Sequence, residues 1–101
     1  MVRHIFLFRL KSDAQQGRQR AVEAIESLRS IEAVQSLEVG TDFAGTPLSY
    51  DVAAIISFAD RDGLAAYEAD PRHRRVVGLM RELSEQAAVV DYDSPSPFSS
   101  T

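Results

Sequence analysis

The chain has 101 residues and a formal net charge of −4, from 11 basic and 15 acidic side chains. Binding to a phosphate backbone needs the opposite balance, so we expect no nucleic-acid partner. The chain has no cysteine, which excludes disulfides, thiol catalysis and thiolate metal ligands. With 45% hydrophobic and 26% charged residues, its composition is that of one small soluble globular domain.

No stretch approaches the roughly 18 consecutive apolar residues that a membrane-spanning helix requires. The apolar run at the start of the chain is interrupted by Arg3, His4 and Arg9, and no small-residue cleavage site follows it. We therefore expect a cytoplasmic protein with no membrane partner.

Residues 2–10, VRHIFLFRL, predict a β-strand with apolar side chains on both faces. Ile5 and Leu7 share one face. The other face carries Val2, Phe6, Phe8 and Leu10. A strand that is apolar on both faces is typical of the centre of a sheet.

The next segment predicts a helix that Ser12 or Asp13 caps and that ends near Ser30. Its apolar stripe is formed by Ala21, Ile25 and Leu28. Charged side chains occupy the opposite side, as expected for a helix that packs on a sheet.

Apolar and polar side chains roughly alternate over residues 34–39, which predicts a half-exposed strand that ends at Gly40. Two glycines and a proline then predict a loop over residues 40–50. Residues 51–58, DVAAIISF, are again apolar on both faces and predict a second central strand.

Asp60 is expected to cap a helix that runs through Tyr67, and Pro71 to begin another that ends near Leu83. Residues 87–93, AAVVDYD, predict a final strand.

The order β-α-β-β-α-β predicts an α+β, ferredoxin-like protomer with a four-stranded antiparallel sheet. We expect the domain to occupy residues 1–93. Residues 94–101 are rich in serine and proline and predict an extended tail.

Helices on one face leave the other face of such a sheet uncovered. Because both central strands are apolar on both faces, solvent contact there would cost several kcal/mol at about 25 cal/mol per Å². That penalty is comparable to the stability of a whole small domain. We therefore predict a homodimer that pairs through the sheet faces, with a cavity for an apolar ligand inside each protomer or between the sheets.

His73, in the segment YEADPRHRRVV, precedes Val76 by three residues and Met80 by seven. This spacing places it on the apolar side of its helix. His4 and Phe6 are two residues apart and therefore lie on the same face of the predicted strand. Tyr67 follows the apolar Leu64 by three residues and therefore lies on the same side of its helix. All three polar rings are thus expected to face inward.

Asp70 suits the position that caps a helix, and Pro71 suits its first turn. His73 would then lie near the positive end of the helix dipole, which disfavours a charged imidazole. A neutral imidazole can act as a general base, and a nearby phenol such as Tyr67 can stabilise an enolate.

Two other interpretations of these residues stay open. Buried histidines and tyrosines often serve only as hydrogen-bonded members of a core, and the arginines around His73 are then a solvated face. A metal site from His4 and His73 lacks an identified third ligand, although Glu68 or Asp70 is available in principle. We expect no metal and no cofactor.

Three segments carry a family resemblance: VRHIFLFRLK, YDVAAIISFADRDGLAAYEADPRHRRV and VVDYD. Together they resemble the stress-responsive dimeric α/β-barrel (Dabb) domain proteins over residues 1–93. The resemblance implies a ferredoxin-like protomer that pairs into a barrel. It departs from the family at Asp70, where histidine is usual before the proline, and this carboxylate is expected to alter the basicity of His73.

A plant member of that family closes a linear polyketide by an intramolecular aldol reaction without a cofactor. The similarity implies that His73 removes a proton between two carbonyls and that Tyr67 hydrogen-bonds the enolate. It also implies a substrate pocket, which we expect to be lined by His4, Phe6, Phe8, Ala54 and Ile56.

The sequence therefore suggests a cofactor-independent polyketide cyclase-like or lyase-type enzyme that acts on a small hydrophobic, carbonyl-rich molecule. One alternative is a non-catalytic stress-responsive dimer that binds a small hydrophobic ligand. Another is a cofactor-free monooxygenase.

Overall fold

The computed structural model describes residues 1–11 and 15–95. They form a four-stranded sheet, three α-helices and a short 3₁₀ helix. In chain order the elements are β1 (Val2–Leu10), α1 (Gln15–Glu26), η1 (Ser27–Ser30), β2 (Ser36–Thr41), β3 (Val52–Phe58), α2 (Arg61–Ala69), α3 (Pro71–Leu83) and β4 (Ser84–Asp93). The strand order is β2-β3-β1-β4, with every neighbouring pair antiparallel. This is the predicted ferredoxin-like fold.

Both strands that the sequence predicts as central, β1 and β3, lie in the middle of the sheet. The second helical region is divided into α2 and α3 at Asp70. β4 begins at Ser84, three residues before the predicted strand, because the chain passes from α3 into it without a loop. The predicted cap at Ser12 or Asp13 lies outside the described residues, as does the tail from residue 96 onward.

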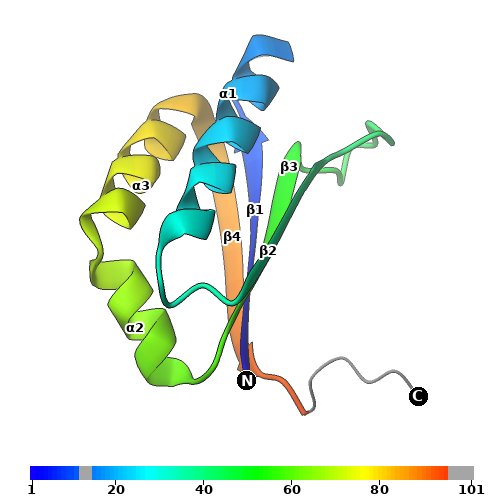
Figure 1. Cartoon of the computed structure of the whole chain (residues 1–101). Helices are drawn as coiled ribbons and strands as arrows, with labels where there is room; N and C mark the ends of the chain where they lie inside the picture. Colours follow the sequence, from blue (N-terminus) through cyan, green and yellow to red (C-terminus); the bar gives the residue numbers. More distant parts are fainter. Residues whose placement is uncertain (12–14, 96–101) are drawn as a thin grey trace.

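All of the helices lie on one face of the sheet (Figure 1). α1 packs on β2 and β3, α2 packs on β1 and β3, and α3 packs on β4. The side chains of this layer and of the sheet face beneath it form the core. Its fully buried large members are Tyr67, Phe58, Ile25, Leu28, Ile56 and Val52. None of the helices in the described part of the chain is long and apolar enough to cross a membrane.

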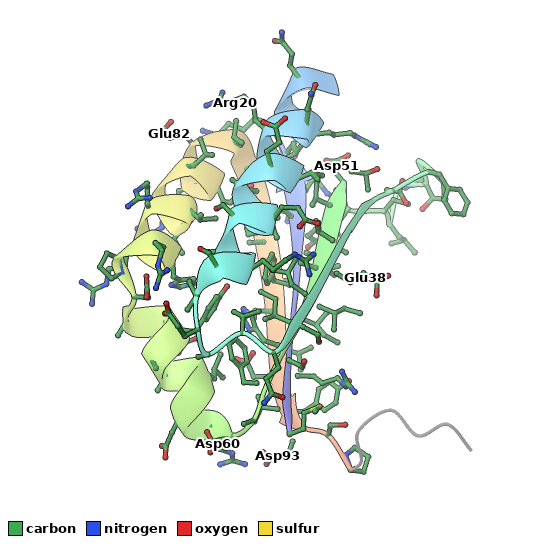
Figure 2. All side chains as sticks on the ribbon, in the orientation of Figure 1. Arg20, Glu38, Asp51, Asp60, Glu82 and Asp93 are labelled. Atoms are coloured by element: carbon green, nitrogen blue, oxygen red, sulfur yellow. The ribbon has the colours of Figure 1, made fainter. Side chains whose placement is uncertain are left out.

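The opposite face of the sheet has no helix on it. Ile55 pairs with Glu38 on one side and Ile5 on the other, and Ile5 pairs with Val90, so these side chains form one row on a single face. Figure 2 shows Glu38 pointing away from the helices. Ile55, Val90 and Tyr92 are 39%, 52% and 41% exposed. The uncovered apolar face is thus the Ile5–Leu7 face of β1, not the Phe6–Phe8 face.

Candidate functional site

A cavity of about 230 Å³ lies between the sheet and the helices. We call it the histidine cavity. Its walls come from β1, β4, α1, η1, α2 and α3. They are His4, Phe6, Phe8, Ile25, Leu28, Tyr67, His73, Val76, Val77, Met80, Ala87, Ala88 and Val89. An apolar wall interrupted by a few polar rings is the usual character of a small-molecule site.

The joint between α2 and α3 brings Tyr67 and His73 together. Asp70 is both the C-cap of α2 and the N-cap of α3. Its carboxylate accepts a hydrogen bond from the backbone N–H of Arg72 at 2.8 Å. Pro71 opens α3 with its fixed φ. This tight turn places the rings of Tyr67 and His73 with their centroids 4.4 Å apart. Both rings also line the cavity, in agreement with the inward orientation that their spacing predicts.

The His73 ring is held by the backbone. Its Nδ1 lies 3.2 Å from the Glu68 carbonyl oxygen. A carbonyl only accepts hydrogen bonds, so Nδ1 carries the proton and, in the neutral ring, Nε2 keeps a lone pair. Burial lowers the pKa of His73 below its usual 6.5, although the Glu68 carbonyl opposes that shift. The neutral form expected from the helix terminus is therefore favoured, with burial as the main cause.

Tyr67 supplies the hydrogen-bond donor of the cavity. The residue is 1% exposed. Burial, followed by the charges of Glu68 and Asp91, raises its pKa above the usual 10. Among the described residues we find no hydrogen-bond partner for its hydroxyl group. The phenol therefore stays protonated over the physiological range and is available to donate to a ligand.

His4 enters the cavity from the sheet. Its Nδ1 is paired with Oδ1 of Asp91, which lies directly opposite on β4. The His4 ring centroid lies 5.8 Å from that of Tyr67, so the Tyr67 ring is a neighbour of both histidine rings. Since a carboxylate accepts hydrogen bonds, Asp91 fixes the proton of His4 on Nδ1.

Asp91 is the site residue that sequence reasoning missed. The available signal was an acidic residue inside the otherwise apolar run AAVVDYD. The pairing register between the first and last strands was needed to place it opposite His4.

The remaining predicted pocket residues divide into two groups. Phe6 and Phe8 line the histidine cavity next to His4. Ala54 and Ile56 do not line it, and both are fully buried in the core. They face the helices as their parity indicates, but β3 lies beneath α1 and α2, whereas the cavity lies over β1 and β4. Their place in the predicted pocket is corrected accordingly.

Within the described residues, no group of three or more His, Cys, Asp or Glu side chains could hold a metal ion. The two acids considered as partners for the histidines are used differently. Glu68 contacts His73 through its backbone carbonyl. Asp70 is bound by Arg72.

Residues 2–94 match the stress-responsive A/B barrel domain (Dabb). The chain belongs to this family. Among curated proteins it is similar to an uncharacterized protein of Streptomyces coelicolor, with 29% identity over 97 residues that cover 92% of this chain and 99% of that protein. Among solved structures it is similar to a dimeric ferredoxin-like protein of unknown function from Bacteroides fragilis, with 29% identity, a TM-score of 0.75, and coverage of 92% and 95%.

Two enzymes share the fold of this Dabb protein at lower identity. A hydroxynitrile lyase from Passiflora edulis is 19% identical, with a TM-score of 0.82 and coverage of 97% of this chain and 96% of the enzyme. An antibiotic biosynthesis monooxygenase is 20% identical, with a TM-score of 0.73 and coverage of 95% and 100%. At these identities the likeness shows the fold alone.

Asp70, where the Dabb resemblance led us to expect a histidine, has a structural task here. Arg72 binds its carboxylate through Nε at 2.9 Å and Nη2 at 2.7 Å. These hydrogen bonds lower the pKa of Asp70 to about 2. Asp70 influences the pKa of His73 less than burial, Glu68 and His4 do. The predicted effect of this carboxylate on His73 is thus small.

Proposed function

We propose that this Dabb protein is a cofactor-independent enzyme of the lyase or cyclase type, acting on a small apolar carbonyl compound. The observation that carries the proposal is the Tyr67–His73 pair in the wall of the histidine cavity. One ring is a neutral base with a fixed tautomer, and the other is a protonated donor. This combination is what proton removal next to a carbonyl requires.

In the proposed reaction, Nε2 of His73 takes a proton from the carbon beside the substrate carbonyl. The electron pair of that C–H bond moves toward the carbonyl oxygen, and the Tyr67 hydroxyl donates a hydrogen bond to the resulting enolate. In a cyclase the enolate carbon then attacks a second carbonyl of the same molecule. The new alkoxide takes the proton from the His73 imidazolium, and His73 thereby returns to its neutral form.

The volume of the histidine cavity limits the reacting part of the substrate. About 150 Å³ is enough to hold benzene in an apolar protein cavity, whereas drug-sized ligands occupy about 300 Å³ or more. At about 230 Å³, the cavity suits one ring or a short folded chain. Phe6 and Phe8 supply apolar contact there, and His4 supplies a polar ring.

A non-catalytic binding protein is the main alternative, since both histidines have partners within the chain. An open cavity that reaches His73 counts against pure packing, because a core filled only for stability leaves few voids larger than water. A cofactor-free monooxygenase would use the same base. Dependence of turnover on dissolved oxygen separates it from a lyase or cyclase.

The proposal can be tested without knowing the substrate. We expect the protein to accelerate deuterium exchange at the methyl group of acetophenone in D₂O, followed by ¹H NMR. His73→Ala should reduce the acceleration by about 10²- to 10⁴-fold, the typical contribution of a general base. Tyr67→Phe should also reduce it, whereas Tyr92→Phe, on the other face of the sheet, should not. Exchange that is equally fast in wild type and in His73→Ala would exclude the assignment.

We also propose that two copies pair through their uncovered sheet faces. The exposed side chains of Ile55, Val90 and Tyr92 and the dimeric nature of the Bacteroides fragilis protein support this. Sedimentation at micromolar concentration should show a dimer, and Ile55→Asp should shift it toward monomer. Ala66→Asp, on the exposed side of α2, is the matched control. A folded wild-type monomer under these conditions would contradict the proposal.

A further inference from the structure

The segment between β2 and β3, residues 42–51, overhangs the uncovered face of the sheet, and we call it the arm. Figure 1 shows it projecting away from the helices. Between the arm and the sheet lies a hollow of about 420 Å³, which we call the arm hollow. The sheet contributes Leu7, Gly40, Thr41, Val52 and Ala53 to its walls, and the arm contributes Asp42, Phe43, Leu48, Tyr50 and Asp51.

The arm holds two large apolar side chains in solvent. Phe43 is 101% exposed and Leu48 is 88% exposed, so neither packs against its own chain. Hydrogen bonds nevertheless fix the arm: Arg18 donates to the Asp42 carbonyl oxygen at 2.9 Å. The backbone N–H of Gly45 donates to the Asp42 carboxylate at 2.7 Å. A preordered segment that exposes apolar side chains is typical of a surface that binds a partner.

The floor of the arm hollow is a row of residues on the uncovered face. Gly40 on β2 pairs with Ala53 on β3, and Ala53 pairs with Leu7 on β1, so all three lie on one face. The protomer itself does not require a glycine at position 40. The backbone of Gly40 has no positive φ, and a Cβ added there would meet nothing within 4 Å. A glycine inside a strand often marks the close approach of another backbone or of a ligand.

We propose that the arm hollow receives side chains of a second copy of this chain, and that Phe43 and Leu48 pack against that copy. This inference rests on the proposed pairing of two sheet faces and extends the contact to the arm. The hollow is continuous with the uncovered face, because Leu7 in its floor is on the same face as Ile5. In a two-fold dimer both copies use the same surface, so each arm makes the contact that its own hollow receives.

The chemistry of the arm hollow favours this occupant. Its two carboxylates already have partners, since that of Asp42 is bonded within the arm and that of Asp51 is bound by Arg18 at 3.0 Å. Most of the remaining wall is apolar, so the hollow suits apolar side chains. The uncovered face of a second copy presents exposed apolar side chains, which are Ile55, Val90 and Tyr92.

Gly40→Val tests the hollow. The added side chain fits the protomer and suits a strand, so the far-UV circular dichroism spectrum should be that of wild type. In the dimer it should overpack the contact and raise the dissociation constant about ten- to hundredfold, measured by sedimentation over a concentration series. Gly78→Ala is the matched control. A Cβ at Gly78 also meets nothing within 4 Å, but this residue is exposed on α3, so the dissociation constant should not change.

Phe43→Ser tests the arm. Because Phe43 is wholly exposed in the protomer, its loss removes no contact within the chain, and it should raise the dissociation constant of the dimer about tenfold. If Gly40→Val or Phe43→Ser keeps the wild-type dissociation constant, the second copy does not occupy the hollow and the inference is overturned. Ile55→Asp would still weaken the dimer in that case, so the pairing of the sheet faces would stand. A wild-type monomer overturns the arm contact and the pairing together, whereas acetophenone exchange tests the proposed chemistry separately.

Discussion

His4 and His73 line the same cavity, and each is held at the same ring atom by a different kind of partner. His4 bonds a side chain, Asp91, on the neighbouring strand. His73 bonds a backbone carbonyl, that of Glu68, five residues earlier in the chain. The first contact joins two ends of the sequence and can be removed by substitution. The second is built into the α2–α3 joint and can be changed only by loosening that joint.

This difference suggests a division of roles. A ring held by a neutral carbonyl in a buried site is well suited to cycle between neutral base and cation during a proton transfer. A ring held by a carboxylate on a rigid strand pair is well suited to orient a substrate. The predictions below test the two histidines separately, through the anchor of His4, the titration of His73 and the cap of the helix that carries His73.

Among the changes that leave both histidines in place, removing the side chain that holds His4 should have the largest effect. We expect Asp91→Leu to slow acetophenone exchange by up to about 100-fold, because a misplaced group in a catalytic site can cost that much. Asp91→Asn keeps an acceptor opposite Nδ1 and should restore most of the rate. Since Asp91 acts through His4, it is a positioning residue, and the rescue by asparagine distinguishes this role from general damage.

Asp93→Leu is the matched control for that experiment. Asp93 is on the same strand but pairs with Arg61 at the end of the sheet, so its loss should leave exchange unchanged. Equal losses in Asp91→Leu and Asp93→Leu would mean that strand stability, not the orientation of His4, governs the rate.

The second prediction concerns pH and isolates His73. Its pKa lies below 6.5, so the neutral base should predominate at pH 7 and be protonated as the pH falls. Exchange should therefore reach a plateau on the alkaline side of the pKa of His73 and decline about tenfold per pH unit on the acid side. No alkaline decline should appear below pH 10, because the pKa of Tyr67 is raised above that value. An acid inflection above 6.5 would contradict the assignment of His73 as the base.

The two histidines also show how far the sequence alone could predict the site. Helical spacing placed His73 on the inner side of α3, and the Asp-Pro pair predicted the start of that helix at the correct residue. Strand parity likewise placed His4 on the helix-facing side of β1. These signals are local, since each depends on residues within one or two turns or on one strand, and they were confirmed.

The contacts that complete the site are not local. His4 and Asp91 are 87 residues apart, and their pairing depends on how β1 and β4 align. Ala54 and Ile56 have the parity expected of pocket residues, but their distance from the cavity depends on which helix covers β3. His73 is held by a backbone carbonyl, that of Glu68. Because every residue has such a carbonyl, no pattern of side chains in the sequence could indicate this partner.

The smallest effect should come from the cap that supports His73. Asp70→Ala removes the acceptor for the Arg72 N–H at the start of α3, so we expect the melting temperature to fall by a few degrees. Acetophenone exchange should slow only a few-fold, because the Glu68 carbonyl still holds the ring. Asp70→Asn, which keeps a capping acceptor, should retain most of both properties.

The fall in melting temperature expected for Asp70→Ala depends on pH in a definite direction. The pKa of Asp70 is lowered from 3.8 to about 2 in the folded protein, so its ionised form stabilises the fold above pH 4. This stabilisation is lost as the pH falls through about 2. The difference in melting temperature between wild type and Asp70→Ala should therefore be constant near neutrality and shrink below pH 4. If Asp70→Ala instead abolished exchange without lowering the melting temperature, the carboxylate would act in the chemistry itself, and His73 would not be the sole base.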